Sequence, residues 1–569
     1  MLIWFVTVSF LWAARARNLT ADATVPRVHL KNGTATGLHS SVYNQDFFLG
    51  IPFATPPLGT HRFRNPQPSL PWNGTLNATS YAPQCVGYGS DETGLPLSED
   101  CLYLNVIRPS GFRYSEKEKL QVGVWTHGGN FVEGETQDSR YNLSFIVQDS
   151  VQIGKPFIGV SIAYRLSGWG FLSSAEVSES GNTNMCLRDQ RLALHWIQGN
   201  IAAFGGDPRR VTIWGESAGA ISIGLHLTAY DGRDDNLFWA AIMESGDPVN
   251  YDSFRTAADH QPMYDNLTII TGCDSASDSL DCLRQVDFDV LDTYFSNWAS
   301  GATPSTLLDP IIDSDIIARW GSKQLSEGAF AHVPLIDGTN TDESVAFATY
   351  GINTTAEFAA DAVDNSTGVY LTPAELVDEL LEHYSNTPEY WLPPPAEIGL
   401  NYTYPLEYGA PYRYEVAYRS DAGFHALRRG TTQTWTANGV PAYSYRFNTV
   451  PNGNSAGVGV SHFSEVAFVF GNTHGDGYNP SPFADRPESY KDLAFLMSAS
   501  WASFIHDRDT NSWRKGLNVS APVWPVYDNA SPENIVWDAN VKDLAWVEPD
   551  TWRKEGIDWI WQHCLAYSR

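Results

Sequence analysis

Basic residues are scarce in this chain. Its 569 residues include 36 Lys and Arg against 65 Asp and Glu, which gives a net charge of −29 at pH 7. So acidic a chain repels the phosphate backbone of nucleic acids and anionic lipid headgroups. This argues against a general nucleic-acid-binding function. Charged residues make up only 18% of the chain and hydrophobic residues 43%, which excludes a disordered or coiled-coil protein.

Cysteine is also scarce. Six cysteines are too few for a disulfide scaffold in so long a chain, although disulfides can still close single loops. No Cys/His grouping has the spacing of a zinc site, so no metal site is predicted. The sequence alone does not choose among the possible pairings. Two pairs are close in sequence and two cysteines stand apart: Cys85 with Cys101, Cys273 with Cys282, and Cys186 and Cys564.

Long hydrophobic runs are missing except at the N-terminus. Residues 2–14 (LIWFVTVSFLWAA) are apolar, and Ala14-Arg15-Ala16 has the small-x-small pattern of a signal-peptidase site. We expect residues 1–16 to be a signal peptide and the mature protein to be secreted and extracellular. The alternative, a membrane anchor, requires an apolar run of about 20 residues. We therefore expect no stable membrane anchor.

Asn-x-Ser/Thr sequons are frequent, and each is a possible glycosylation site if the chain enters the secretory pathway. The eleven candidates are Asn18, Asn32, Asn73, Asn77, Asn142, Asn266, Asn353, Asn365, Asn401, Asn518 and Asn529.

Short β-branched or aromatic runs alternate with helical patterns, which predicts an α/β architecture on a largely parallel sheet. Residues 122–126 and 157–164 are predicted to be buried strands. The apolar spacing within residues 187–204 predicts a helix, which Gly-Gly-Asp-Pro then ends. Residues 211–214 are the next predicted strand, and residues 218–229 the next helix.

A G-x-S-x-G sequence lies between that strand and that helix. In Gly215-Glu216-Ser217-Ala218-Gly219, a sharp turn from strand to helix would expose the serine oxygen, and the two glycines would permit the close backbone approach. We predict that Ser217 is a nucleophile and that Ala218 N–H helps to bind an oxyanion. The alternative is a glycine-flanked serine in an ordinary turn.

A glycine-rich loop follows the predicted strand 122–126. It reads His127-Gly128-Gly129-Asn130-Phe131, and its place upstream of the serine favours an oxyanion hole over a plain turn. Gly129 and Asn130 are the predicted donors.

These motifs belong to a pattern that runs through most of the chain. It includes FFLGIPFATPPLGTHRFRNPQP, SEDCLYLNV, HGGNFVEG, IAYRLSGWGFLSS, TIWGESAGA, DGTNTDES and GVSHFSEVAFVFGN. The chain resembles the type-B carboxylesterase/lipase (cholinesterase-like) family of the α/β-hydrolases. The resemblance implies an α/β-hydrolase fold: one catalytic domain, residues 17–569, with a mostly parallel mixed sheet, helices on both faces and a deep gorge above the serine. It implies no cofactor.

The resemblance also supplies the other two catalytic residues. The family's acid lies in a G-x-N-x-x-E context, which Glu343 matches, with Asp342 as the alternative. The family's histidine precedes a short helix, and His462 stands before Glu465-Val466-Ala467-Phe468-Val469-Phe470-Gly471. The order Ser217, Glu343, His462 is that of α/β-hydrolases.

Other roles follow only from the resemblance. Glu216, Ser245 and Glu465 match positions that line or support the family's catalytic centre. The family pairs Cys85 with Cys101, and Cys273 with Cys282. It also implies buried ion pairs between Arg62 and Glu99 and between Arg165 and Asp189.

The expected function is a secreted serine carboxylesterase that acts on small-molecule esters with short-to-medium acyl or aromatic groups. Residues 86–100, between two cysteines, contain no Trp and few large apolar groups, which argues against choline specificity and an interfacial lipase. Asn130 replaces a glycine of many relatives and adds a side chain near the scissile carbonyl. The alternatives are a triacylglycerol lipase and, because this fold also serves as a binding ectodomain, a non-catalytic module.

Overall fold

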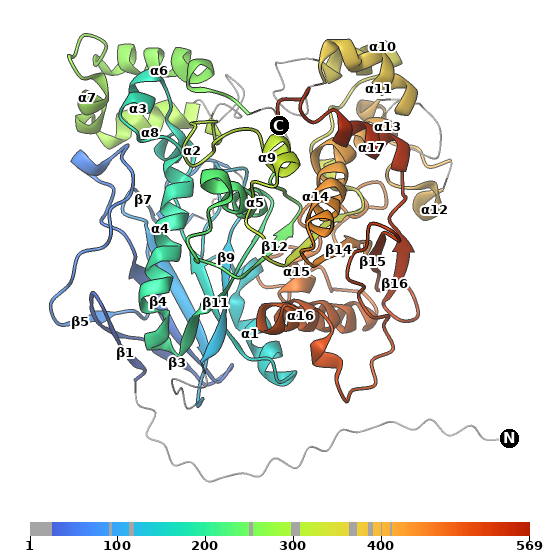
Figure 1. Ribbon diagram of the computed structural model, residues 1–569, viewed down its shortest axis with the longest axis horizontal. Helices are drawn as coiled ribbons and strands as arrows, with labels where there is room; N and C mark the ends of the chain where they lie inside the picture. Colours follow the sequence, from blue (N-terminus) through green and yellow to red (C-terminus); the bar gives the residue numbers. More distant parts are fainter. Residues whose placement is uncertain are drawn as a thin grey trace.

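An eleven-stranded mixed sheet forms the centre of the computed structural model (Figure 1). The structure describes residues 25–89, 94–112, 119–249, 254–297, 308–363, 372–384, 391–399, 401–409 and 412–569. The predicted signal peptide and the sequons at Asn18 and Asn365 lie outside these ranges.

From one edge to the other, the central sheet has the following strands: β16 (Ala545–Pro549), β15 (Glu533–Trp537), β14 (Ala442–Phe447), β13 (Leu335–Asn340), β12 (Ala240–Glu244), β11 (Gly206–Glu216), β9 (Leu120–Thr126), β10 (Phe157–Ile162), β8 (Tyr103–Pro109), β4 (Gln45–Pro52) and β3 (Leu38–Ser40). Neighbours from β15 to β10 are parallel, and the strands at both edges are antiparallel. The predicted α/β fold with a mostly parallel mixed sheet is confirmed.

The predicted strands 122–126, 157–164 and 211–214 correspond to β9, β10 and β11. β11 begins earlier than predicted because Gly205, at φ 92°, already ends the preceding helix. Gly206 then pairs with Leu120 of β9, and the register shifts before Val211. The Gly-Gly-Asp-Pro sequence thus ends the helix and also starts the strand.

Helices cover both faces of the sheet, because side chains alternate between the faces along each strand. Val122 and Val124 of β9 pack in a hydrophobic cluster with α4 (Met185–Asn200), α5 (Ala218–Gly232) and α14 (Ala426–Ala437). Trp125, the residue after Val124, packs in the cluster on the opposite face with α1 (Leu143–Gln152), α15 (Val466–Val469) and α16 (Ser489–Asp507).

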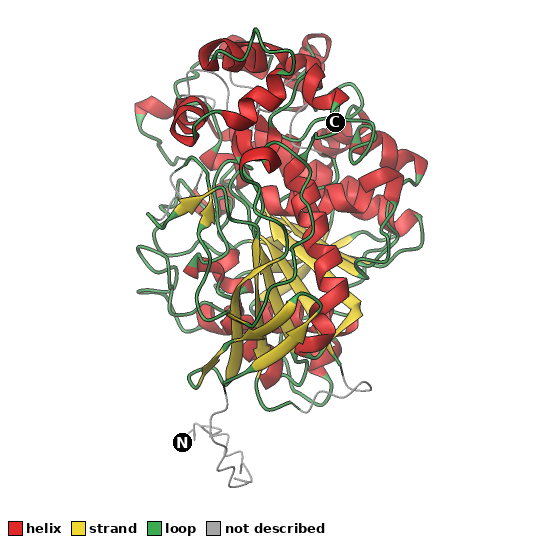
Figure 2. Cartoon of the chain, turned by 90° about the vertical axis from the view of Figure 1, so that its left-hand side faces the viewer, coloured by secondary structure: helices red, strands yellow, loops and turns green. Residues whose placement is uncertain are grey.

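The remaining helices gather above one end of the strands (Figure 2). Within the part of the chain that the structure describes, every helix is too short or too polar to cross a membrane. These helices are α2 (Ser167–Phe171), α3 (Ala175–Glu179), α6 (Ala257–Thr271), α7 (Ser279–Gln285), α8 (Phe288–Asn297), α9 (Gly321–Glu327), α10 (Thr355–Ala362), α11 (Val377–His383), α12 (Pro395–Ile398), α13 (Tyr412–Ser420) and α17 (Lys554–Gln562).

Two small sheets lie apart from the central one. The first has β1 (Arg27–Leu30), β2 (Gly33–Thr36) and β5 (Thr75–Asn77), and the second has β6 (Gln84–Cys85) and β7 (Leu97–Ser98).

The structure contains both disulfides that the family resemblance implies. Cys85 bonds Cys101 and closes the loop that carries β6 and β7, and Cys273 bonds Cys282 between α6 and α7. The remaining two cysteines, Cys186 and Cys564, are free and buried.

Both ion pairs implied by the resemblance are also present. Arg62 Nε lies 2.6 Å from Glu99 Oε1, and Arg165 Nη2 lies 2.7 Å from Asp189 Oδ1. All four side chains are less than 10% exposed, so these pairs belong to the buried framework.

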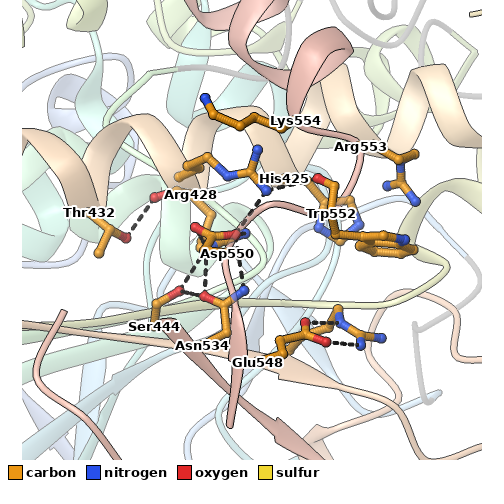
Figure 3. A network of polar contacts seen from close by, with 12 residues as sticks. His425, Arg428, Thr432, Ser444, Asn534, Glu548, Asp550, Trp552, Arg553 and Lys554 are labelled. Atoms are coloured by element: carbon orange, nitrogen blue, oxygen red, sulfur yellow. Dashed lines mark hydrogen bonds and ion pairs between the residues drawn. The ribbon is translucent and has the colours of Figure 1, made fainter. Parts of the chain in front are cut away.

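A third buried ionic network connects α14 to β14, β15 and the segment after β16 (Figure 3). Asp550 accepts hydrogen bonds from Arg428 Nη1 (2.7 Å), Arg429 Nη2 (2.9 Å) and Asn534 Nδ2 (3.1 Å). Ser444 Oγ donates to Asn534 Oδ1 at 2.6 Å. One carboxylate therefore anchors two arginines of α14 to the edge of the sheet.

The described sequons differ in accessibility. Asn142 is half-buried and its side chain caps α1 by accepting from Ser144 N, and Asn32 is half-buried and donates to Ser69 O. The exposed sequon residues are Asn73, Asn77, Asn266, Asn353, Asn401, Asn518 and Asn529.

Candidate active site

Ser217 lies in the turn between β11 and α5. Its backbone has φ 54° and ψ −126°, a conformation that L-residues rarely adopt. Two hydrogen bonds hold this strained turn: Ser217 N donates to Glu244 O of β12 at 2.9 Å, and Ile221 N donates to Ser217 O at 2.9 Å. Ser217 is half-buried, whereas both of its neighbours are buried. The strained turn thus leaves Ser217 partly accessible while the residues on either side of it are buried.

The two glycines of the motif are sterically required. A Cβ on Gly219 would lie 2.1 Å from Thr126 O, and one on Gly215 would lie 2.5 Å from the carbonyl carbon of Gly219. Both distances are shorter than a van der Waals contact. The atoms concerned belong to the backbone, so they cannot move aside as a flexible side chain could. The turn therefore packs directly against the carboxyl end of β9.

The loop after β9 passes beside this turn. A Cβ on Gly128 would lie 2.9 Å from Ser217 Cβ, so the glycine allows the loop to approach the serine. Gly129 has φ 99° and Asn130 has φ 52°, and this left-handed pair redirects the chain. Gly129 and Asn130 directly follow the glycine that approaches the serine, and their role as oxyanion donors stays a prediction.

His127 and Tyr164 shape the base of this loop. Their rings stack with centroids 4.3 Å apart, and Tyr164 Oη donates to His127 O at 2.6 Å. His127 Nδ1 lies 2.9 Å from Gly128 O, and burial lowers the pKa of His127 to about 4. The imidazole is therefore neutral at physiological pH and holds the loop by hydrogen bonding.

His462 connects the serine turn to a buried carboxylate. Its Nδ1 lies 2.6 Å from Glu343 Oε2, and its Nε2 lies 3.2 Å from Oε1 of Glu216, the residue before Ser217. Among the described residues, Nε2 has no hydrogen-bond partner. The ring therefore has one nitrogen on the carboxylate and the other free toward the serine turn.

Glu343 begins a short 3-10 helix, Glu343–Ala346, after β13. Its Oε1 accepts hydrogen bonds from Asn340 N (2.7 Å) and Ser245 Oγ (2.6 Å). Asn340 Nδ2 in turn donates to Glu465 Oε2 at 2.5 Å. Ser245 and Glu465, which the resemblance placed around the catalytic centre, thus lie directly behind Glu343.

The buried carboxyl groups alter the proton affinities of this cluster. Burial acts to lower the pKa of His462, but the charges of Glu216 and Glu343 outweigh it and raise this pKa to about 9. Burial, with the charge of Glu343, raises the pKa of Glu465 to about 7. Burial, with the charges of Glu465 and Glu343, raises the pKa of Glu216 well above its ordinary value. The proton affinities of these groups therefore depend on one another.

Asp342, the alternative acid, points elsewhere. Its Oδ2 accepts a hydrogen bond from Val460 N at 2.7 Å, and burial raises its pKa to about 8. Of the two adjacent acids, Glu343 is the one in contact with His462.

Sequence analysis missed two phenylalanines beside His462. The rings of Phe347 and Phe424 have centroids 5.2 and 5.1 Å from the imidazole. Phe347 comes shortly after Glu343 in the sequence, and this proximity could have suggested that its ring lies near the site. Phe424 comes from the π-helix Asp421–His425, and no local sequence signal placed it here.

Comparisons with known proteins agree with this architecture. The model of the Carboxylesterase family matches residues 24–543. "Secreted lipase 1" of Botryotinia fuckeliana is 32% identical over 570 residues, covering 93% of each chain. Acetylcholinesterase of Bungarus fasciatus is 31% identical and covers 95% of this chain and 86% of its own.

A solved structure is similar over almost the whole chain. The crystal structure of Aspergillus niger EstA superposes with a TM-score of 0.79 at 26% identity, covering 96% of this chain and 99% of EstA. The described fold and the family match are thus independent and consistent. The chain belongs to the carboxylesterase family of carboxylic-ester hydrolases.

Proposed function

We propose that the chain is a secreted serine carboxylesterase in which Ser217, His462 and Glu343 form the catalytic triad. The observation that carries the proposal is the position of His462, with Nδ1 2.6 Å from Glu343 and Nε2 3.2 Å from Glu216, the residue before Ser217. A neutral imidazole held in this way has the correct tautomer to accept the serine proton.

The reaction follows from this arrangement. His462 Nε2 takes the proton of Ser217 Oγ while the oxygen attacks the ester carbonyl carbon, and Glu343 stabilises the imidazolium. The tetrahedral intermediate collapses, the alcohol leaves with the proton from His462, and an acyl-enzyme forms. Water, deprotonated by His462, then attacks the acyl-enzyme and releases the acid.

Three backbone N–H groups are proposed to bind the oxyanion: those of Gly129, Asn130 and Ala218. Ala218 supports this assignment because it is the first residue of α5, where N–H groups have no partner within the helix. Gly129 and Asn130 support it because their left-handed backbone places the loop beside the serine.

We propose esters with short-to-medium acyl or aromatic groups as substrates. Phe347 and Phe424 flank His462 and favour an apolar or aromatic substituent near the reacting carbonyl. The loop between Cys85 and Cys101 contains no Trp, the ring that binds a cation best, which argues against choline esters.

The test of the mechanism is Ser217→Ala, with Ser326→Ala on the exposed side of α9 as the control. We expect the first variant to lose at least about 10⁴-fold in kcat on p-nitrophenyl butyrate, and the second to keep the wild-type rate. Undiminished hydrolysis by Ser217→Ala would refute the triad.

A triacylglycerol lipase is the second candidate, favoured by the relatives that are named lipases. A series of p-nitrophenyl esters of increasing chain length, followed through each ester's solubility limit, separates the two. We expect the rate to decline for long chains and to change smoothly at the limit. A sharp rise in rate above it would identify a lipase.

We also propose secretion and glycosylation. N-terminal sequencing of protein from the culture medium should begin at Arg17, and deglycosylation should lower its mass. An uncleaved N-terminus on secreted protein would contradict the predicted signal peptide.

A further inference from the structure

A pocket of about 300 Å³ lies between the start of α10, residues 391–399 and 401–409, and the first turn of α13. It is on the side of the molecule where α10 to α13 gather (Figure 1). Its lining among the described residues does not include Ser217, Glu343 or His462. We call it the tyrosine pocket, defined by Trp391, Tyr402, Tyr404, Tyr412, Arg413 and Tyr414.

Arg413 is the only charged side chain of that set. It is 7% exposed, and its guanidinium stacks over the Trp391 ring, 4.6 Å from the centroid. Nη1 donates to Gly399 O at 3.3 Å and Nη2 donates to Pro393 O, while Nε has no hydrogen-bond partner among the described residues. Each Nη carries a second N–H as well, so the cation keeps donors beyond these two carbonyl contacts.

Among the described residues, Arg413 and Arg569 make no ion pair with a side-chain carboxylate, whereas the other strongly buried arginines do. A buried cation without a counter-charge is costly, because desolvation is not offset. Burial lowers the pKa of Arg413, and the charges of Tyr404 and Asp342 offset this effect only in part. The buried arginines that do pair with a carboxylate are Arg62, Arg165, Arg191, Arg284, Arg419, Arg428, Arg429 and Arg553.

The tyrosines supply rings whose orientation is fixed. Tyr404 Oη donates to Gly457 O at 2.9 Å, and Tyr412 Oη donates to Val345 O at 3.1 Å. The Tyr404 ring lies 5.0 Å from both the Tyr402 and the Tyr412 ring, at 72° and 57°. Such tilted rings present faces and edges to a further aromatic ring. The pocket therefore combines an aromatic wall with one cation.

We propose that the tyrosine pocket binds an aryl carboxylic acid, with its ring among the tyrosines and its carboxylate on the guanidinium of Arg413. The volume suits a molecule with one ring and a short side chain, since it is at the lower end of small-molecule pockets. A planar guanidinium also matches a carboxylate better than any neutral group.

The experiment is isothermal titration calorimetry of the full-length protein with trans-cinnamate. Cinnamyl alcohol is the uncharged analogue, and hexanoate the non-aromatic acid. We expect one cinnamate site per chain and at least tenfold weaker binding of both analogues. Arg413→Gln should weaken cinnamate binding about tenfold or more, because a charge-assisted hydrogen bond is lost. The control, Arg209→Gln, changes a guanidinium on a side chain that is 84% exposed and should bind as the wild type does.

A repeat of the titration after Ser217 is blocked with phenylmethylsulfonyl fluoride distinguishes the two sites. Binding that persists supports the tyrosine pocket, and binding that disappears places the ligand at the active site and overturns the proposal. Equal affinity for cinnamate in wild type and Arg413→Gln also overturns it. Should Arg413→Gln fail to fold, Tyr402→Ala decides: it must weaken cinnamate binding and leave hexanoate binding unchanged.

Discussion

Nε2 of His462 lies 3.2 Å from Oε1 of Glu216, and neither atom makes a hydrogen bond among the described residues. The charge of Glu216, together with that of Glu343, raises the pKa of the proposed base. An ionised Glu216 favours the imidazolium, which cannot act as a base. The residue before the nucleophile is thus placed to tune the pH range of hydrolysis.

The first prediction concerns that pH range. The pKa of His462 is raised from 6.5 to about 9, so kcat/KM should rise with pH and its ascending limb should have an apparent pKa above 6.5. Glu216→Gln removes one of the acids that retain the proton, so the limb should move to lower pH by about one pH unit. The measurement is the pH profile of kcat/KM on a neutral ester.

Glu488→Gln is the control for this profile, because the Glu488 side chain is 75% exposed and lies in the N-terminal turn of α16. The ascending limb of the kcat/KM profile of Glu488→Gln should coincide with that of the wild type. An unchanged or upward-shifted limb in Glu216→Gln would show that Glu216 does not act on His462.

The second prediction separates the two adjacent acids. Glu343→Gln should lower kcat by about 10³ to 10⁴, because the amide no longer stabilises the imidazolium. Asp342→Asn should keep kcat within about tenfold, since Asp342 has its pKa raised to about 8 and is already neutral at pH 7. Single-turnover kinetics on both variants at pH 7 is the measurement. A reversed order would make Asp342 the catalytic acid.

The strand-turn-helix motif singled out Ser217, and the family resemblance singled out Glu343 and His462, which the structure brings into contact; their catalytic roles stay predictions. Such motifs do not predict which residues from distant segments contact the site. Phe424 reaches His462 from a π-helix, and this contact depends on how distant segments pack.

The fold was predictable to a similar degree. Apolar runs located β9, β10 and β11, but the start of β11 at Gly206 depends on pairing with Leu120, a tertiary contact that the local helix-ending signal does not reveal. The tyrosine pocket was not predicted at all, because Arg413 and its surrounding rings show no periodicity or motif.

The third prediction tests the steric argument for the serine turn. Gly219→Ala places a Cβ 2.1 Å from Thr126 O, so the turn or β9 must shift. We expect a loss of about 1 to 3 kcal/mol in the free energy of unfolding and a loss of most activity. Urea denaturation and ester hydrolysis are measured on the same preparation.

Gly199→Ala is the matched control, since Gly199 lies in α4 and its Cβ would meet only the flexible end of Lys31, 3.1 Å away. It should leave activity intact and raise stability by up to about 1 kcal/mol. Equal behaviour of the two alanine variants would remove the steric explanation for the motif glycines.

The fourth prediction concerns the network in Figure 3. Burial alone would raise the pKa of Asp550, but the charges of Arg428 and Arg429 outweigh burial and hold it well below 3.8. Because this pKa is lower in the folded than in the unfolded state, the carboxylate stabilises the fold fully above pH 3.8, and this stabilisation declines as the pH falls further. Asp550→Asn leaves the buried Arg428 without its ion pair and Arg429 with only Asp558, 4.0 Å away, and should cost about 3 to 5 kcal/mol.

Urea denaturation at pH 7 and pH 5 tests both the size and the pH dependence of this effect. The cost of Asp550→Asn should be the same at the two values, since Asp550 stays ionised in the folded state and the unfolded group is mostly ionised as well. The control is Asp315→Asn, whose side chain is 57% exposed and pairs with Arg188, and it should cost less than about 1 kcal/mol. If the two substitutions cost the same, Asp550 does not compensate the buried arginines of α14.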